Sequence, residues 1–215
     1  MTSAGGNNRS ADLVPNASLP YREDRERAGP SLTTANAAAL KEKRVVLSAA
    51  SLQRTLERLA IQIVEPNGAS ADLVLIGVRK GGENLAHRIH AEIKHRTGIS
   101  VPLGFLNVTI YRDDAAARDM PDSQINVDLS GKEVVIIDDV LYTGRTVRSA
   151  LDAITDLGRS KVTRLCVLID RGLRELPIQA DYVGRFVPTA HDEHVEVVLR
   201  REPSDADRVV IYERT

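Results

Sequence analysis

A pair of adjacent carboxylates stands at the end of an apolar run in the stretch VVIIDDVLYTGRT, residues 134–146. Such a run is typical of a strand that is covered on both faces of a parallel sheet, and Asp138 and Asp139 follow it. The next turn combines two hydroxyls with a glycine and an arginine: Thr143, Gly144, Arg145 and Thr146. Backbone N–H groups and the helix dipole at a strand-to-helix turn favour a bound anion. The stretch therefore predicts a phosphate site whose attached sugar lies near the two carboxylates.

Two familiar nucleotide motifs do not describe this turn. The Walker spacing G-x-x-x-x-G-K-[ST] is absent, and so is the dinucleotide fingerprint G-x-G-x-x-G. In a purely structural interpretation, Asp139 caps the turn and Asp138 pairs with a basic neighbour. The whole string favours a chemical role, because carboxylates accept hydrogen bonds from vicinal hydroxyls and stabilise developing positive charge.

Two more strand ends carry polar chemistry. A turn with two cations and two glycines follows the predicted strand 72–78: Arg79, Lys80, Gly81 and Gly82. The sequence DRG stands at the end of the predicted strand 164–170, as Asp170, Arg171 and Gly172. Ligands of an open parallel sheet bind outside the carboxyl ends of its strands, so we expect all three turns to face one ligand.

The alternation of strands and helices from about residue 45 predicts an α/β fold. Apolar residues recur at helical spacing in three segments, which predicts helices over 49–65, 83–96 and 146–157. The residues expected to face the core are Leu52, Leu56, Leu59, Ile63, Leu85, Ile89, Ile93, Val147, Ala150, Leu151 and Ile154. Strands are expected over 45–47, 72–78, 101–111, 133–138 and 164–170, followed by shorter closing strands. The pattern indicates a doubly wound, mainly parallel twisted sheet flanked by helices, with a small added β element.

The first part of the chain differs in composition from the rest. Residues 1–43 are rich in Ser, Asn, Pro, Gly and charge, without an apolar period, and we expect a disordered N-terminal extension. One domain is expected over 44–215, with a mainly aliphatic core because aromatic residues make up only 3% of the chain. The net charge of −1 does not indicate a nucleic-acid binder, although a local basic face remains compatible with it.

Cysteine usage and hydropathy bear on the compartment. The single cysteine, Cys166, lies in the apolar run LCVLI and is expected to be a buried thiol in a reducing environment. The sequence lacks an apolar run of the roughly 18 residues that a membrane helix needs, so a cytoplasmic location without a membrane partner is expected. His191 and His194 in HDEH have a spacing that suits a turn before a strand better than a metal site.

The string from the apolar strand to TGRT resembles the PRPP-binding signature of type I phosphoribosyltransferases. Three segments extend the resemblance: DDVLYTGRTVRSALDAITDLGR, LIDRGLRELPIQADYVGRFVPT and VTIYRDD. Together, over roughly 45–213, they resemble the pyrimidine-operon regulators, which are mRNA-binding attenuation proteins with uracil phosphoribosyltransferase activity. The resemblance implies the type I phosphoribosyltransferase fold and the reaction of uracil with PRPP to UMP and diphosphate. Alternatives are a nucleotide-sensing RNA-binding attenuator with little or no catalysis, and a transferase for another base.

The resemblance also implies roles for the residues. Thr143, Gly144, Arg145 and Thr146 would hold the 5′-phosphate, and Asp138 and Asp139 would hold the ribose hydroxyls and stabilise its cationic transition state. Mg²⁺ would be carried by PRPP, without a dedicated protein site. The turn with Arg79, Lys80, Gly81 and Gly82 would be the pyrophosphate loop. Tyr111, Arg112, Asp113 and Asp114 would enter a flexible lid, and Asp170, Arg171 and Gly172 would shape the base pocket. The implied partners are PRPP, uracil, UMP or UTP and leader mRNA of pyrimidine genes, with a homodimer or homotetramer as the assembly.

Two departures from the family pattern stand out. The pyrophosphate loop of the family usually reads G-I-x-T-R-G, whereas Gly81 stands here where the arginine is expected. On the implied RNA face, four arginines match the family: Arg54, Arg58, Arg174 and Arg185. Family threonine, histidine and arginine positions hold other residues instead: Glu57, Ile61, Pro66 and Leu173. Each lost cation is expected to weaken RNA binding in a salt-dependent way.

Overall fold

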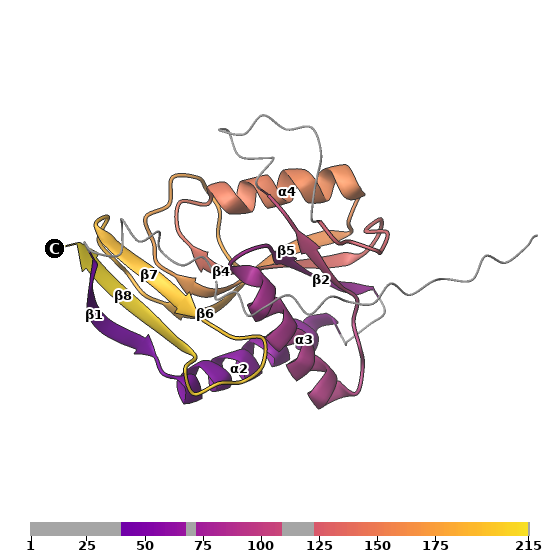
Figure 1. Ribbon diagram of the computed structural model, residues 1–215. Coiled ribbons are helices and arrows are strands. Elements are labelled where there is room, and N and C mark those ends of the chain that lie inside the picture. Colours follow the sequence, from indigo (N-terminus) through magenta and orange to yellow (C-terminus); the bar gives the residue numbers. More distant parts are fainter. Residues whose placement is uncertain (1–39, 68–71, 109–122, 215) are drawn as a thin grey trace, which may run out of the picture.

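The main sheet is built from five parallel strands in the order β3-β2-β4-β5-β6 (Figure 1). The structure is a computed structural model that describes residues 40–67, 72–108 and 123–214. The strands are β2 (Leu73–Val78), β3 (Leu103–Leu106), β4 (Glu133–Leu141), β5 (Val162–Asp170) and β6 (Tyr182–Phe186). All of β2 is buried, as expected of a strand that helices cover on both faces.

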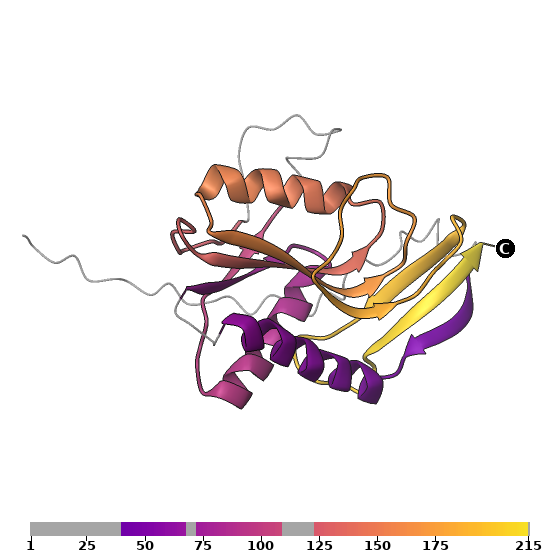
Figure 2. The same ribbon diagram turned by 180° about the vertical axis from the view of Figure 1, so that it is seen from behind.

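Helices cover both faces of this sheet. Helix α4 (Arg145–Leu157) lies on one face, and α2 (Ala49–Asn67) and α3 (Gly82–Thr97) lie on the other (Figures 1 and 2). The predicted inward residues of α2 and α3 are all buried: Leu52, Leu56, Leu59, Ile63, Leu85, Ile89 and Ile93. The apolar side chains of the two faces form separate clusters, with the sheet between them. None of the helices in the described ranges has the length and hydropathy needed to cross a membrane.

A small antiparallel sheet stands beside one end of the main sheet (Figure 1). Its strands, in the order β1-β8-β7, are β1 (Leu40–Leu47), β8 (Arg208–Arg214) and β7 (Glu193–Val198). This sheet is the added β element that the sequence predicts, and we call it the hood. The parallel sheet with flanking helices and a hood confirms the predicted fold class.

Several strand boundaries differ from the sequence prediction. Strand β3 covers only Leu103–Leu106 of the predicted strand 101–111, whose last three residues lie outside the described ranges, and β5 begins at Val162 and not at residue 164. Strand β1 already begins at Leu40, ahead of the predicted domain start at residue 44, because Leu40 pairs with Arg214 of the C-terminal strand. The predicted strand 133–138 continues to Leu141, since its ladder with β5 extends as far as Asp170. Both extensions depend on partners that are distant in the sequence.

One predicted core residue is not buried. The sequence pattern places Leu151 inward, but this side chain is 38% exposed, so the prediction is wrong there. The buried stripe of α4 contains Ala150, Ala153 and Ile154. With about 100° between successive residues, Leu151 lies at the edge of that stripe and not at its centre.

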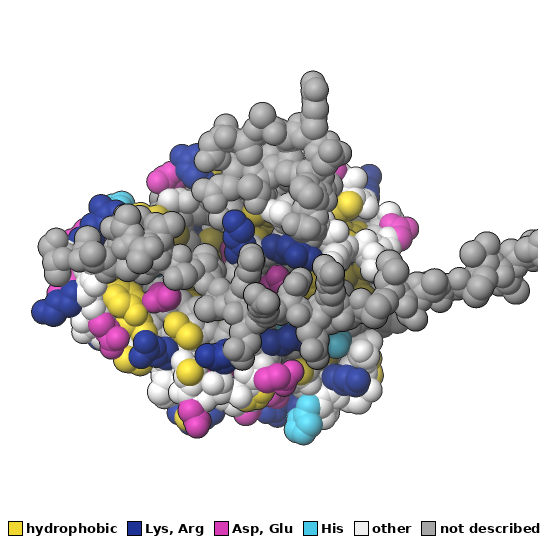
Figure 3. All heavy atoms as spheres, in the orientation of Figure 1, with side chains coloured by type: hydrophobic (Ala, Val, Ile, Leu, Met, Phe, Trp, Pro, Cys, Tyr) yellow, Lys and Arg dark blue, Asp and Glu magenta, His cyan; other side chains and the backbone are white. Residues whose placement is uncertain are grey.

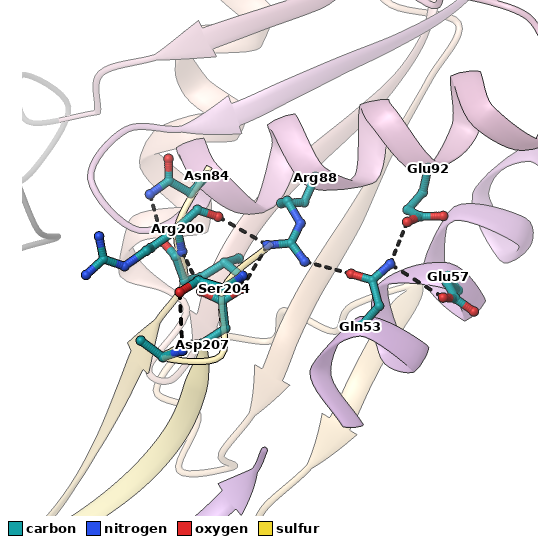
Figure 4. Close-up of polar contacts among 10 residues, drawn as sticks. Gln53, Glu57, Asn84, Arg88, Glu92, Arg200, Ser204 and Asp207 are labelled. Carbon is teal, nitrogen blue, oxygen red and sulfur yellow. Dashed lines mark hydrogen bonds and ion pairs between the residues drawn. The ribbon is translucent and has the colours of Figure 1, made fainter. Parts of the chain in front are cut away.

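A buried ion pair ties the hood to the helices (Figure 4). Arg88 of α3 donates from Nη1 to Oδ2 of Asp207 at 2.9 Å, and the two side chains are only 6% and 2% exposed. The backbone N–H groups of Arg200 and Ser204 also donate to Asp207, at 3.0 and 3.2 Å. Arg88 donates from Nη2 to Gln53 of α2 at 2.6 Å. The network therefore connects α2, α3 and the turn between β7 and β8.

A half-buried histidine on α3 makes stability depend on pH. The ring of His87 lies 4.7 Å from that of Phe105, and burial, with the charge of Arg201 and the nearby His90, lowers the pKa of His87 to about 4. The unfolded chain binds this proton more readily, with a pKa of 6.5, so the free energy of unfolding falls as the pH drops from 6.5 to about 4. We expect His87→Phe to remove this part of the slope in urea unfolding. Parallel pH profiles of the variant and the wild type would contradict this.

Candidate active site

Asp138 and Asp139 lie near the carboxyl end of β4, the central strand of the main sheet. Asp138 is 5% exposed, and its Oδ1 accepts the backbone N–H of Asp139 at 3.0 Å. Asp139 is half-buried, and its Oδ1 accepts the N–H of Val140 at 2.8 Å. Within the described ranges, no Lys or Arg forms an ion pair with either carboxylate. The basic neighbour of the structural interpretation is therefore not found there.

Burial makes the charge on this pair costly. It raises the pKa of Asp138 well above its ordinary value, and the neighbouring charge of Asp139 adds to that rise. Burial also raises the pKa of Asp139, while the Val140 N–H lowers it. Removal from water disfavours the charged form of a carboxyl group. The site is therefore suited to a ligand that offers hydroxyl donors or positive charge.

The turn with Gly81 and Gly82 lies directly against the two aspartates. A Cβ atom on Gly81 would stand closer than 3.0 Å to Oδ1 of Asp139, and one on Gly82 would stand as close to the carbonyl oxygen of Ile137. Real Cβ atoms do not approach that closely, so these positions are open only to glycine unless Asp139 or the β4 backbone moves. The structure thus brings together the predicted pyrophosphate loop and the acidic pair.

Two cations precede these glycines. Lys80 is exposed and has a positive φ of 80°, which non-glycine residues adopt rarely. Arg79 is half-buried, and its backbone N–H donates to the Leu106 carbonyl at 2.8 Å. Its side-chain Nε is buried and has no hydrogen-bond partner among the described residues. A buried donor without an acceptor is unusual in a native protein, which makes Arg79 a candidate for binding an anion.

The predicted phosphate turn lies at the N-terminus of α4. Gly144 has a φ of 93° and precedes the helix, so the chain turns sharply there. The Thr143 hydroxyl accepts the backbone N–H of Arg145 at 3.4 Å. The Arg145 side chain pairs with Glu175, Nη2 to Oε2 at 2.8 Å, with both side chains exposed. Thr146 is the second residue of α4, where helix N–H groups and the dipole favour an anion.

Arg174 joins this turn to the segment that follows β5. Its guanidinium donates from Nη1 to the Tyr142 carbonyl at 2.9 Å and to the Gly172 carbonyl at 3.0 Å. Nη2 pairs with Oδ2 of Asp170 at 2.5 Å. These contacts hold the phosphate turn beside the predicted base-pocket residues. Arg174, one of the four arginines implied for RNA binding, therefore has a structural role in these loops.

Arg171 connects the base-pocket segment to the hood. It is buried, and its Nη2 donates to the carbonyls of Ala190 at 2.9 Å and Glu193 at 2.7 Å. Its guanidinium carbon lies 4.2 Å from the ring centroid of Tyr142, in a cation–π contact. Gly172 follows with a φ of 76°. The role of Arg171 as an anchor could not be read from local sequence, because its hydrogen-bond partners lie 18 to 22 residues away.

His194 is a further residue that acts on the acidic pair. His194 belongs to β7 of the hood, and its positive charge would act on Asp139, since each group affects the pKa of the other. In the described residues, no three His, Cys, Asp or Glu side chains gather as a metal site. Tyr111, Arg112, Asp113 and Asp114, the predicted entrance to the lid, lie outside the described residues.

Comparison with known proteins shows the family of the chain. Residues 46–199 match the family model of the phosphoribosyl transferase domain. A relative from Pelotomaculum thermopropionicum, named bifunctional protein PyrR, is 49% identical over 80% of this chain and 97% of its own. Its namesake from Chloroflexus aurantiacus is 51% identical over 77% of this chain and 93% of its own. The chain belongs to the PyrR family of phosphoribosyl transferases.

Solved structures with the same fold are more distant from this PyrR-family chain. The hypoxanthine phosphoribosyltransferase of Trypanosoma cruzi aligns with a TM-score of 0.63 at 19% identity, covering 81% of this chain and 98% of that one. A hypoxanthine-guanine phosphoribosyltransferase from Bacillus anthracis aligns with a TM-score of 0.60 at 22% identity, covering 80% and 99%. At such identities the likeness establishes the type I phosphoribosyltransferase fold alone.

The arginines implied for RNA binding in the PyrR family lie on two neighbouring elements. Arg54 and Arg58 are exposed on α2, and Arg185 is exposed on β6. Arg58 donates from Nη2 to the carbonyls of Val183 at 3.2 Å and of Gly184, which directly precedes Arg185. Three of the four predicted arginines therefore lie close together, while Arg174 is held in the active-site loops.

The positions that depart from the family also have a structural setting. Glu57 pairs with Arg96 of α3, Oε2 to Nη2 at 3.1 Å, which reduces its repulsion toward a phosphate (the Glu57 side chain is labelled in Figure 4). Ile61 is 47% exposed on α2, Pro66 lies in the last turn of that helix, and Leu173 has a φ of 59°. On the face drawn in Figure 3, basic and acidic side chains are interspersed, as the near-zero net charge suggests.

Proposed function

We propose that the protein transfers the phosphoribosyl group of PRPP to uracil and releases UMP and diphosphate. The observation that carries this proposal is the close contact of Gly81 with the Asp139 carboxylate. It joins the turn assigned to the diphosphate to the pair assigned to the ribose. The segment DRGLRELPIQADYVG supports uracil as the acceptor, since purine transferases differ there.

In the proposed complex, the helix α4 N-terminus and the 143–146 turn bind the 5′-phosphate. The ribose 2′- and 3′-hydroxyls donate to Asp138 and Asp139. As the bond from the anomeric carbon to the diphosphate oxygen breaks, positive charge develops on the sugar, and the carboxylates of Asp138 and Asp139 stabilise it. Uracil N1 then forms the new bond to the anomeric carbon, and its proton passes to the released diphosphate or to water. Arg174 and Arg171 act as positioning residues, because they hold the surrounding loops.

Mg²⁺ is the metal that we assign to the reaction, and it arrives with PRPP. The residues present fit a hard cation of this kind, since the Asp138 and Asp139 oxygens are ligands that Mg²⁺ accepts and their burial makes a positive partner favourable. When bound, the ion offsets the charge of the diphosphate leaving group. Most of its ligands would be diphosphate and ribose oxygens.

We propose that Arg79 takes the role of the arginine that the family usually has at the position of Gly81. Its buried Nε has no acceptor among the described residues, and it stands two positions before the glycine that touches Asp139. A diphosphate oxygen would satisfy that donor. We expect Arg79→Gln to raise the KM for PRPP about tenfold, which corresponds to the roughly 1.4 kcal/mol of one charge-assisted hydrogen bond. Lys94→Gln, at an exposed position of α3, is the control; equal KM values for both variants would sink the assignment.

The transfer is tested by incubating the wild-type chain with PRPP, Mg²⁺ and uracil and following diphosphate release. Orotate in place of uracil is the matched control for base choice. Diphosphate released with uracil and not with orotate is the result that the proposal expects. No release from a folded chain would favour the alternative, a nucleotide-sensing attenuator with little catalysis.

We also propose that the protein binds leader mRNA of pyrimidine genes in response to UMP or UTP. The exposed cluster of Arg54, Arg58 and Arg185 supports this role, because cations near phosphates supply much of the affinity for RNA. The proposed assembly is a homodimer or homotetramer that completes the basic face across subunits. Filter binding to a leader hairpin with and without UMP tests the role: binding should strengthen with UMP and weaken steeply with salt. Affinity that is indifferent to UMP would contradict it.

A further inference from the structure

A groove lies where the hood meets the edge of the main sheet. Its volume is about 280 Å³, and its lining includes Arg44 and Val45 of β1 and Arg185 and Phe186 of β6. Arg185 spans the two strands, since its Nη1 donates to the Val46 carbonyl at 3.0 Å. Within the described residues, β1 is an edge strand of the hood and β6 an edge strand of the main sheet. The groove is therefore formed by two strand edges that one arginine bridges.

The groove exposes an aromatic ring among cations. Phe186 is 63% exposed, the highest value among the large apolar side chains described, and Val45 is 49% exposed. Arg44 and Arg185 are exposed on either side of the groove. Because aromatic residues make up only 3% of the chain, an exposed phenylalanine at this place is a specific feature. An apolar ring next to arginines matches the π-face of a nucleobase and the charge of its phosphate.

The groove is continuous with the arginines of the proposed RNA face. Arg58 of α2 contacts the carbonyl of Gly184, and the next two residues of β6 are Arg185 and Phe186. Arg185 in turn contacts Val46, beside Arg44. A basic strip thus runs from α2 across β6 to β1 and contains the exposed ring. Charge complementarity favours RNA over an apolar protein segment as the occupant.

We infer that this groove binds an unpaired nucleotide of the RNA, with the base stacked on Phe186 and the phosphate beside Arg44 and Arg185. This inference rests on the proposed RNA role and adds which part of the RNA the protein recognises, namely an unpaired nucleotide. The strip then requires a loop or bulge, because bases inside a duplex are not available for stacking. The groove also adjoins the active site, since Phe186 pairs with Asp170 at the end of β5.

The test uses a hairpin RNA whose loop carries 2-aminopurine, and a fully paired duplex with the same stem. The wild-type chain is expected to quench the 2-aminopurine fluorescence and to bind the hairpin more tightly than the duplex. Phe186→Ala should lose the quenching and weaken hairpin binding about 5- to 150-fold, the range measured for one stacked base. Phe186→Tyr should retain both, and Ile99→Ala, which removes another exposed apolar side chain, should change neither.

Different negative results would overturn the groove assignment and the RNA role. If the wild type binds the hairpin and Phe186→Ala binds it equally well with unchanged quenching, the groove assignment is overturned and the RNA role stands. If the wild type binds neither RNA at low salt with UMP present, the RNA role itself is overturned. Loss of self-association in Phe186→Ala by sedimentation, with RNA binding unchanged, would assign the groove to a protein contact and also overturn the inference.

Discussion

Asp139→Asn is expected to lower kcat for UMP formation by about 10²–10³-fold, the loss typical when one preorganised electrostatic group is removed. The amide keeps an oxygen that can accept the Val140 N–H, so the local backbone is preserved. It cannot supply the negative charge that stabilises the cationic sugar. The measurement is steady-state UMP formation, with Glu65→Gln at an exposed position of α2 as the control.

The same substitution is expected to raise stability at neutral pH. Because burial raises the pKa of Asp139 in the folded protein, protonated Asp139 favours the folded state. This contribution to the free energy of unfolding is present at low pH and is lost as the pH rises. The amide of the variant has no charge to bury. In urea unfolding, the advantage of Asp139→Asn over the wild type should therefore grow from pH 4 to pH 8. A variant that is both inactive and less stable at pH 8 would indicate a merely structural role.

Asp207→Ala is expected to destabilise the fold by about 3–5 kcal/mol, since it leaves Arg88 buried without its charge partner. It also removes the acceptor of the Arg200 and Ser204 N–H groups, which shape the turn between β7 and β8. The hood should therefore lose its protection against hydrogen exchange before the main sheet does. Urea unfolding gives the stability, and hydrogen exchange of β7 and β8 gives the local effect.

Two further variants separate the charge from the packing. The double variant Arg88→Met with Asp207→Leu removes both charges, so its free energy of unfolding should fall clearly less than that of Asp207→Ala. Asp152→Ala removes one partner of an exposed pair with Arg148 on α4 and should change stability by less than about 1 kcal/mol. An Asp207→Ala variant no less stable than Asp152→Ala would refute the role assigned to the buried pair.

Much of the fold could be predicted from periodicity. The apolar positions of α2 and α3 are buried as expected, because each helix packs one continuous stripe against the sheet. The prediction for the α4 stripe is less accurate, since Leu151 stands at its edge. The start of β1 could not be predicted, because its pairing with β8 joins the two ends of the described chain.

Part of the candidate site was also visible in the sequence. The acidic pair lies near the carboxyl end of β4, the glycine-containing phosphate turn follows β4, and the RKGG turn follows β2. Parallel strands bring their carboxyl ends to one edge of the sheet. Local sequence did not reveal that Arg174 connects two loops, that Arg171 donates hydrogen bonds to the segment leading into the hood or that Asp139 lies against Gly81. These contacts depend on chain packing in three dimensions. The last of them gives a physical reason for glycine at the position where the family has arginine.

The most direct test of the central claim is a comparison of uracil with hypoxanthine as acceptors for PRPP in the same wild-type preparation. We expect UMP formation that requires PRPP, with IMP formed at least about 10²-fold more slowly, because a site that hydrogen-bonds one base edge rejects another. Formation of IMP at a rate equal to that of UMP, or no transfer to uracil by the folded chain, would contradict it.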